Sequence, residues 1–221
     1  MAPPNIENKK DLNYKSIFLS ASIPDELDQT FKAQKLYTSI IIFVQRILAA
    51  KGRIIFGGHP TITPLVKKAA QRTQKTSANI DLFQLRCFEK QAPDDIWDSS
   101  VFETIRWFGS GEKMHMLEGL EDMRNEMAKQ SSSAIFIGGK TDNRGIYDEY
   151  KKFLKYHPEG PVYLLGFMDG DTVKIIKELR EKGNKEPNGL TEEERQVIHN
   201  SDNIDIIVDL VIDDLAHQLS E

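Results

Sequence analysis

The feature of this sequence that most constrains its fold is the alternation of short apolar runs with longer segments in which apolar residues recur every three or four positions. Apolar runs typical of buried strands lie at residues 15–22, 53–58, 80–88, 133–139 and 161–167. Strands that alternate with helices in this way form parallel sheets joined by right-handed crossovers. We therefore expect an α/β fold, in which a doubly wound, mostly parallel, Rossmann-like sheet of five or more strands is flanked by helices.

Helical periodicity and capping signals place helices between and after these strands. The expected helices cover about residues 27–52, 63–73, 113–129, 145–154, 171–183 and 204–219. Thr191 and Glu194 have the spacing of a capping box. Residues 89–111 are irregular and fit a long loop with a short helix inside it. In that loop Trp97 and Trp107 either stack on a nucleobase or pin the loop to the core.

Length and composition fit one self-sufficient domain. The chain has 221 residues, of which 39% are hydrophobic and 29% are charged. A chain of this size can bury roughly 70% of its unfolded surface without disulfides or metals. No linker or internal repeat divides it, which predicts a polar leader over residues 1–14 and a single domain over residues 15–221. The amphipathic helix at the end of that domain favours a homo-oligomer.

Cysteine and histidine usage excludes several kinds of protein. Cys87 is the only cysteine, so it cannot form an intramolecular disulfide, and the five histidines are too far apart for a zinc motif. The N-terminus lacks the apolar core of a signal peptide, and the most apolar stretch, residues 40–44, is far shorter than the roughly 20 residues that cross a bilayer. We expect a cytoplasmic protein with no metal, no cofactor and no membrane contact.

Charge is distributed unevenly along the chain. The net charge is −5, which argues against nucleic-acid binding. Residues 29–80, however, contain nine lysines and arginines and no aspartate or glutamate. These side chains either cover solvated helix faces or create a positive local field that attracts an anionic ligand.

Two of the expected strands end in a Gly-Gly turn, in FGGHPT at residues 56–61 and in IGGKTDNRGIYDE at residues 137–149. The carboxyl edge of an open parallel sheet is where such folds bind ligands. Glycine lets the backbone approach a phosphate, and the following helix offers free N–H groups. Tight turns also use glycine for steric reasons alone, but two such turns beside the serines that end the first strand indicate nucleotide or phosphosugar binding. The Gly-x-Gly-x-x-Gly and P-loop motifs are missing, which excludes dinucleotide cofactors and P-loop chemistry.

The segments IFLSASIP, IIFGGHPTITPL, MRNEM and FIGG, spread over about residues 16–167, form a recognisable set. Together they resemble the SLOG superfamily, the SMF/DprA-LOG-like group of Rossmann-like ligand sensors from prokaryotic conflict systems. The run from MRNEM to IYDEY is also similar to the related LOG phosphoribohydrolases, whose signature joins an Arg-Lys-x-Glu-Met helix to Pro-Gly-Gly-x-Gly-Thr-x-x-Glu. The resemblance implies a ligand that lies across the ends of the first, second and fourth expected strands. It also implies an ADP-ribose-like or cyclic nucleotide signal as the ligand, and a TIR-type enzyme or an effector as partner.

The family motifs, matched to this chain, give a set of candidate ligand-binding residues: Ser20, Ala21, Ser22, Gly57, Gly58, His59, Thr61, Gly138, Gly139, Arg144, Gly145 and Glu149. Glu149 either accepts a ribose hydroxyl, acts as an acid or base, or is simply a glutamate that the helix dipole favours. Arg144 and Arg124 suit a bidentate phosphate clamp, although Arg124 also fits an exposed helix position. His59 either donates to a phosphate or base edge or faces water. The two serines either bind ligand hydroxyls or cap the next helix.

Departures from the hydrolase pattern favour binding over catalysis. Met123 stands where the hydrolases have their catalytic arginine, and Arg124 follows about 100° further round the helix. The glycine motif is opened by residues 140–144, and Ile146 replaces the threonine that would contact phosphate. We expect a sensor of a nucleotide-derived ligand rather than an enzyme. The alternatives are a phosphoribohydrolase that cleaves nucleoside monophosphates through Glu149 and Arg124, a TIR-like NAD-cleaving enzyme suggested by the opening FLSAS, and an interaction module with an empty crevice.

Overall fold

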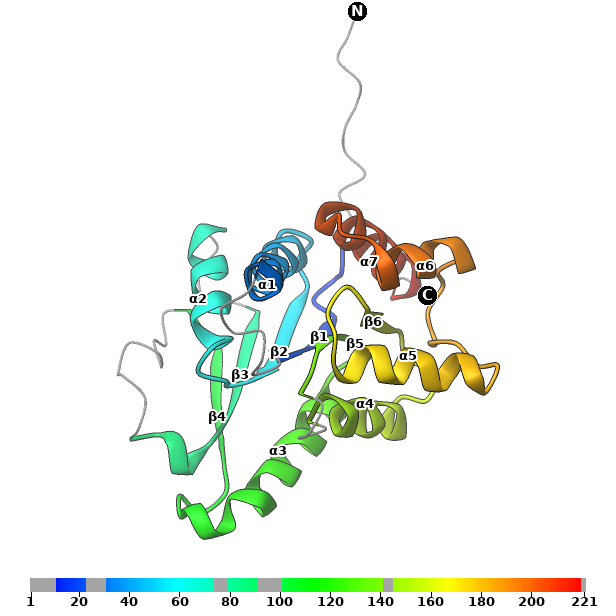
Figure 1. Ribbon diagram of the computed structural model, residues 1–221. Helices are drawn as coiled ribbons and strands as arrows, with labels where there is room; N and C mark the ends of the chain where they lie inside the picture. Colours follow the sequence, from blue (N-terminus) through cyan, green and yellow to red (C-terminus); the bar gives the residue numbers. More distant parts are fainter. Residues whose placement is uncertain (1–10, 23–30, 74–78, 91–100, 141–144, 220–221) are drawn as a thin grey trace, which may run out of the picture.

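The computed structural model describes residues 11–22, 31–73, 79–90, 101–140 and 145–219. Within them the chain forms a six-stranded parallel sheet in the order β4-β3-β2-β1-β5-β6 (Figure 1). The strands are β1 (Ser16–Ser22), β2 (Arg53–Gly57), β3 (Ile80–Leu85), β4 (Thr104–Phe108), β5 (Ser133–Gly138) and β6 (Val162–Leu165). The helices are α1 (Phe31–Ala49), α2 (Thr63–Arg72), α3 (Met116–Gln130), α4 (Gly145–Tyr156), α5 (Asp171–Glu181), α6 (Glu192–Asn200) and α7 (Ile204–Gln218). The expected doubly wound α/β fold is confirmed.

The strand order makes the carboxyl end of β1 the switch point of the sheet. From β1 the chain moves outward through β2 and β3 to β4, and it then returns to the other side of β1 for β5 and β6. Phe18 in β1 accordingly pairs with Ile55 in β2 on one side and with Ala134 in β5 on the other. Open parallel sheets bind ligands in the crevice at such a switch point. β2 and β5, the two strands that flank β1, are the strands that end in the two predicted glycine turns.

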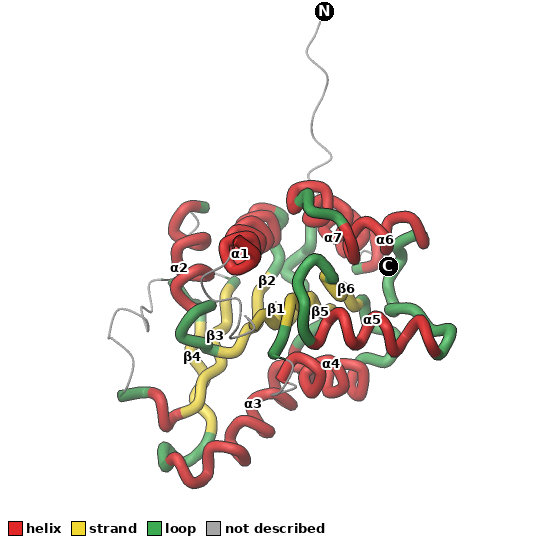
Figure 2. The backbone as a smooth tube through the Cα atoms, in the orientation of Figure 1, coloured by secondary structure: helices red, strands yellow, loops and turns green. Residues whose placement is uncertain are grey.

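Helices cover both faces of the sheet and give three layers (Figure 1 and Figure 2). One face carries α1, α2 and α7, and the other carries α3, α4 and α5. The side chains of β1 alternate between these faces, because Ile17 and Leu19 belong to the first core and Phe18 belongs to the second. In α1 the buried residues recur at helical spacing: Leu36, Ile40, Phe43, Val44 and Ile47.

The edge strand β4 differs from the expectation for residues 89–111. It pairs with β3 from Asp81–Thr104 to Leu85–Phe108, where we expected a long loop with a short helix. Each of its five residues is half-buried, and polar and apolar residues alternate from Thr104 to Trp107. This is the period of a half-buried strand, which the expectation of a loop overlooked. Trp107 belongs to this strand, and Trp97 lies outside the described residues.

The C-terminal helices pack onto their own chain. The predicted capping box at the start of α6 is confirmed, since the Thr191 and Glu194 side chains each accept a hydrogen bond from the other residue's N–H group. The apolar face of α7 packs against α1 and the sheet core, and Tyr163 in β6 donates to Asp214 in α7 over 2.7 Å. That face is thus covered within the chain and by itself gives no support to the expected homo-oligomer. Among the described helices, none has both the length and the apolar character needed to span a bilayer.

Candidate functional site

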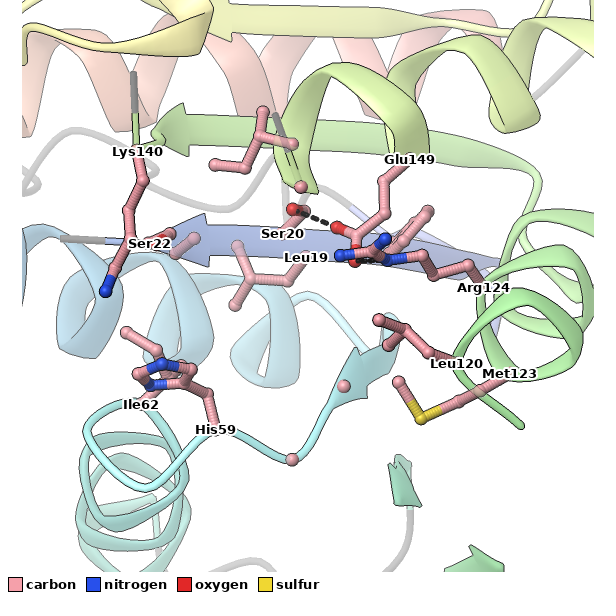
Figure 3. Close-up of a pocket in the computed structure, with 16 residues that line it drawn as sticks. Leu19, Ser20, Ser22, His59, Ile62, Leu120, Met123, Arg124, Lys140 and Glu149 are labelled. Atoms are coloured by element: carbon pink, nitrogen blue, oxygen red, sulfur yellow. Dashed lines mark hydrogen bonds and ion pairs between the residues drawn. The ribbon is translucent and has the colours of Figure 1, made fainter. Parts of the chain in front are cut away.

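A cavity of about 210 Å³ opens at the carboxyl end of β1 (Figure 3). Its lining comes from β1 (Phe18, Leu19, Ser20, Ala21 and Ser22), from β2 and the turn after it (Gly57, Gly58, His59 and Ile62), from α3 (Leu120, Met123 and Arg124), and from the segment after β5 and α4 (Lys140, Gly145, Ile146 and Glu149). Elements from both sides of β1 contribute, so the cavity occupies the switch point of the sheet.

Most of the predicted site residues meet at this cavity. Those that line it are Ser20, Ala21, Ser22, Gly57, Gly58, His59, Gly145, Glu149 and Arg124. Thr61, Gly138 and Gly139 do not line it, and Arg144 lies outside the described residues. Sequence reasoning missed Lys140, which directly follows the second Gly-Gly pair and could have been found from that position. It also missed the apolar lining, because Ile62, Leu120, Met123 and Ile146 have the spacing of ordinary helix core.

Glu149, near the start of α4, is held by two other elements. Its Oε2 accepts a hydrogen bond of 2.5 Å from Ser20 Oγ in β1, and its Oε1 accepts one of 3.2 Å from Arg124 Nε in α3. The side chain is only 15% exposed. Burial raises the pKa of the Glu149 carboxyl above its ordinary value, and the Arg124 charge and the Ser20 hydrogen bond offset only part of that rise. Such a carboxyl can accept a hydrogen bond from a ligand hydroxyl or, when protonated, donate one.

Arg124 reaches Glu149 even though Met123 holds the position of the hydrolase arginine. Both side chains line the cavity (Figure 3), because a long arginine side chain spans an offset of one residue round the helix. Besides the bond from Nε to Glu149, Nη1 donates to Asp148 Oδ2 over 3.1 Å. Nη2 lies beside the first residue of α4, since a Cβ on Gly145 would be 3.0 Å from it. The arginine therefore faces both carboxylates and the N-terminus of α4.

Comparison with known proteins assigns the chain to a family. The model of the SLOG cluster3 family matches residues 32–192. The chain belongs to the SLOG cluster3 family. Its fold is similar to that in the X-ray structure of the structural-genomics target TM1055, with a TM-score of 0.58 and 14% identity over 89% of this chain and 98% of that one. At that identity the similarity concerns the fold alone. A search of curated proteins gave no match.

In this SLOG domain the glycine turns do not offer the free amides that we predicted. The N–H group of Gly58 donates to the Phe83 carbonyl over 2.7 Å, and that of Gly139 donates to the Ser22 carbonyl over 3.0 Å. Gly138 has a φ of +74°, and a Cβ there would lie 2.5 Å from the Ser22 carbonyl oxygen. The expectation that the backbone of both turns approaches a phosphate is therefore wrong for the N–H groups of Gly58 and Gly139, which are already engaged within the protein. In the second turn, glycine is needed for close packing against β1.

His59 and Thr61 form a compact turn at the mouth of the cavity. The Thr61 N–H group donates a hydrogen bond to His59 Nδ1 over 3.2 Å, and the His59 carbonyl oxygen accepts one from the Thr63 hydroxyl over 2.9 Å. Because Nδ1 is an acceptor, the neutral His59 ring carries its proton on Nε2. Lys140 reaches toward the same mouth from the side of β5 (Figure 3). Thr61 thus orients His59 and does not itself line the cavity.

The polar groups of the SLOG cavity suit an organic anion that carries hydroxyls. Ser20 and Glu149 are hydrogen-bonding partners for hydroxyl groups, and Arg124 and Lys140 are partners for a negative charge. Among the described residues, no group of three or more His, Cys, Asp or Glu side chains could hold a metal ion. The arrangement therefore favours recognition by hydrogen bonds and charge.

Proposed function

We propose that this SLOG domain binds a nucleotide-derived small molecule at the switch point and acts as a ligand sensor. The observation that carries the proposal is the cavity at the end of β1, in which Arg124 and Lys140 stand beside the hydrogen-bonded pair of Ser20 and Glu149. Few classes of metabolite combine an anionic group with a diol as nucleotides and phosphosugars do. The positive stretch of residues 29–80 does not add to this argument, because none of its described lysines and arginines lines the cavity and four of them pair with carboxylates: Lys35, Arg46, Lys51 and Arg53.

Each part of such a ligand has a partner in the cavity. A phosphate would contact Arg124 Nη2, Lys140 and the N–H groups of Gly145 and Ile146 at the start of α4, where the helix dipole favours an anion. The next N–H group, that of Tyr147, donates to Asp171 Oδ2 over 3.4 Å. Arg144 would join this clamp. Glu149 and Ser20 would take the ribose hydroxyls, and the apolar wall that includes Met123 would contact the sugar or base.

The finer parts of the proposal rest on the family resemblance. We infer an ADP-ribose-like or cyclic nucleotide signal, produced by a TIR-type enzyme or passed on to an effector, in a cytoplasmic antiphage defence or signalling system. The output would be a change in self-association, which makes a homo-oligomer part of the proposal. The proposal includes neither nucleic acid, which the net charge of −5 argues against, nor a membrane.

A second candidate function is a phosphoribohydrolase, and the contact between Arg124 and Glu149 favours it. A protonated Glu149 could give its proton to the leaving base as the N-glycosidic bond breaks, while water adds to C1′ of the ribosyl group and returns a proton to the Glu149 carboxylate, which leaves ribose 5-phosphate. The raised pKa of Glu149 suits this role of general acid.

Binding is tested by thermal shift and calorimetry with AMP, NAD, ADP-ribose and cyclic ADP-ribose. A ligand at about 100 times its Kd should add about 2.7 kcal/mol of stability. Arg124→Gln should weaken binding roughly 10- to 100-fold, because it removes a charged hydrogen-bond donor. Lys129→Gln, at an exposed position of α3, is the matched control and should bind as the wild type does.

The same incubations separate a sensor from an enzyme. Chromatography should recover the bound ligand intact if the domain is a sensor. Release of ribose 5-phosphate that Glu149→Gln abolishes, while Glu159→Gln at an exposed position retains it, would establish the hydrolase instead. If no nucleotide shifts the unfolding temperature, the crevice is empty and the binding proposal fails.

A further inference from the structure

A network of ion pairs continues from the cavity into the contact between α3 and α4. α3 supplies Glu121 and Arg124, and α4 supplies Asp148, Glu149 and Lys152; we call these five residues the α3–α4 charge ladder. Lys152 Nζ lies 2.6 Å from Asp148 Oδ1 and 2.8 Å from Glu121 Oε2. Arg124 bridges Asp148 and Glu149 over 3.1 and 3.2 Å. The spacing of three residues between Glu121 and Arg124 on α3, and of four between Asp148 and Lys152 on α4, keeps each of these pairs on one helix face.

Lys152 is unusually well buried for a lysine, with 9% of its surface exposed. A buried ammonium costs free energy unless carboxylates offset the lost hydration. Burial lowers the pKa of Lys152, but its hydrogen bonds to Asp148 and Glu121 raise it above the ordinary value, so the side chain is charged at neutral pH. Neither Lys152 nor Asp148 lines the cavity. The pair can therefore affect a ligand only through its neighbours in the ladder.

The single positive charge of Arg124 interacts with two carboxylates, those of Asp148 and Glu149. Lys152 occupies Oδ1 of Asp148, so Asp148 meets Arg124 only through Oδ2. Arg124 also donates a hydrogen bond from Nε to Glu149, and its Nη2 lies beside Gly145 at the start of α4. If Lys152 were neutral, the uncompensated charge of Asp148 would attract the guanidinium more strongly and draw it away from Glu149.

We propose that Asp148 and Lys152 are positioning residues of the cavity: Asp148 orients Arg124, and Lys152 offsets the charge of Asp148 so that Arg124 stays on Glu149. The part that concerns Glu149 is independent of any ligand, whereas the part that concerns ligand affinity rests on the proposed function. The other charged or titratable groups that line the same cavity are His59 from the turn after β2 and Lys140 from the segment after β5, and Ser20 of β1 donates to Glu149.

The first test measures the pKa of Glu149 in the ligand-free protein by NMR of ¹³C-labelled glutamate, with the signal assigned from Glu149→Gln. Lys152→Met should raise this pKa, because Arg124 shifts toward Asp148. Asp148→Asn should lower it, because a neighbouring negative charge is lost while the amide oxygen still accepts from Arg124. Lys152→Arg should restore the wild-type value. Lys155→Met removes an exposed charge from the same helix and should leave the value unchanged.

A purely structural ladder gives a different result. If Lys152→Met and Asp148→Asn change the free energy of unfolding but leave the pKa of Glu149 unchanged, the ladder only joins the helices and the proposal is overturned. Should Lys152→Met fail to fold, the shift in Asp148→Asn relative to the wild type decides, since a pKa that stays the same or rises in that variant contradicts the proposal.

The second test measures the affinity for AMP and ADP-ribose by calorimetry. Lys152→Met should weaken binding by about fivefold, the upper end of what a single partly exposed ion pair contributes. Lys152→Arg should bind as the wild type does, and Asp148→Asn should bind more tightly because a carboxylate that competes with the phosphate for Arg124 is gone. Equal affinities in all variants would overturn the ligand part of the proposal. If the wild type binds neither compound, the proposed function fails, and the NMR titration still decides the role of the ladder.

Discussion

Gly138→Ala should destabilise the protein strongly, although the residue does not touch the cavity. Its φ of +74° is a left-handed conformation, which costs an alanine about 1–2 kcal/mol. The added Cβ would also lie 2.5 Å from the main-chain oxygen of Ser22, and a main-chain atom in a central strand cannot move away cheaply. Together these effects should lower the free energy of unfolding by about 2–4 kcal/mol. For a chain of this size that corresponds to a fall of roughly 5–15 °C in Tm.

Urea and thermal unfolding followed by circular dichroism measure this loss, and Gly57→Ala is the matched control. Gly57 lines the cavity, and its Cβ would lie 3.5 Å from the Met123 side chain, an ordinary contact distance. Gly57→Ala should therefore change the free energy of unfolding by less than about 0.5 kcal/mol. Equal stability of Gly138→Ala and Gly57→Ala would refute the claim that the second glycine turn is a packing device.

Two further predictions concern buried polar groups. The pKa of Glu149 is raised in the folded state, so the folded protein holds this proton more tightly than the unfolded chain does. The free energy of unfolding of the wild type therefore falls as the pH rises from the ordinary value of 4.5 through the folded pKa. Glu149→Gln removes this dependence, so in urea unfolding at several pH values the variant should gain stability relative to the wild type as the pH rises, and a constant difference would contradict the assignment. Tyr163→Phe should lower the free energy of unfolding by about 1.5–3 kcal/mol, because it removes a hydrogen bond to the Asp214 carboxylate. If the same assay gives a decrease no larger than that caused by Tyr156→Phe at an exposed position, this prediction is wrong.

The strands that sequence reasoning found are those that the fold buries most completely. β3 and β5 are buried at every residue and appear as continuous apolar runs. β4 lies at the edge of the sheet with Thr104 and Arg106 among its half-buried residues, so it has no continuous apolar run and carries only a short polar–apolar alternation over residues 104–107. A strand of this kind is defined by pairing with its neighbour, and pairing between distant segments leaves little trace in local sequence.

The candidate site was predictable where backbone position alone fixes it. Ser20 and Gly57 follow from the rule that parallel strands bind ligands at their carboxyl ends. The contact of Glu149 with Arg124 was harder to foresee, because Arg124 lies on α3 and the rotation of α3 relative to α4 depends on packing. Because Arg124 is one residue away from the position of the hydrolase arginine, the sequence predicts that it does not reach Glu149. The arginine side chain is long enough to make this contact all the same.

The outcome at the glycine turns changes how the motif should be interpreted. A Gly-Gly pair after a strand predicts a backbone that approaches a phosphate, but Gly58 and Gly139 donate their N–H groups to carbonyls within the sheet edge. The second turn allows a close approach of the end of β5 to β1, and the α4 helix that follows carries Glu149 within reach of Ser20. On the proposed function, recognition would depend on side chains and the α4 terminus, so Arg124 and Glu149 would determine the ligand more directly than the glycines do.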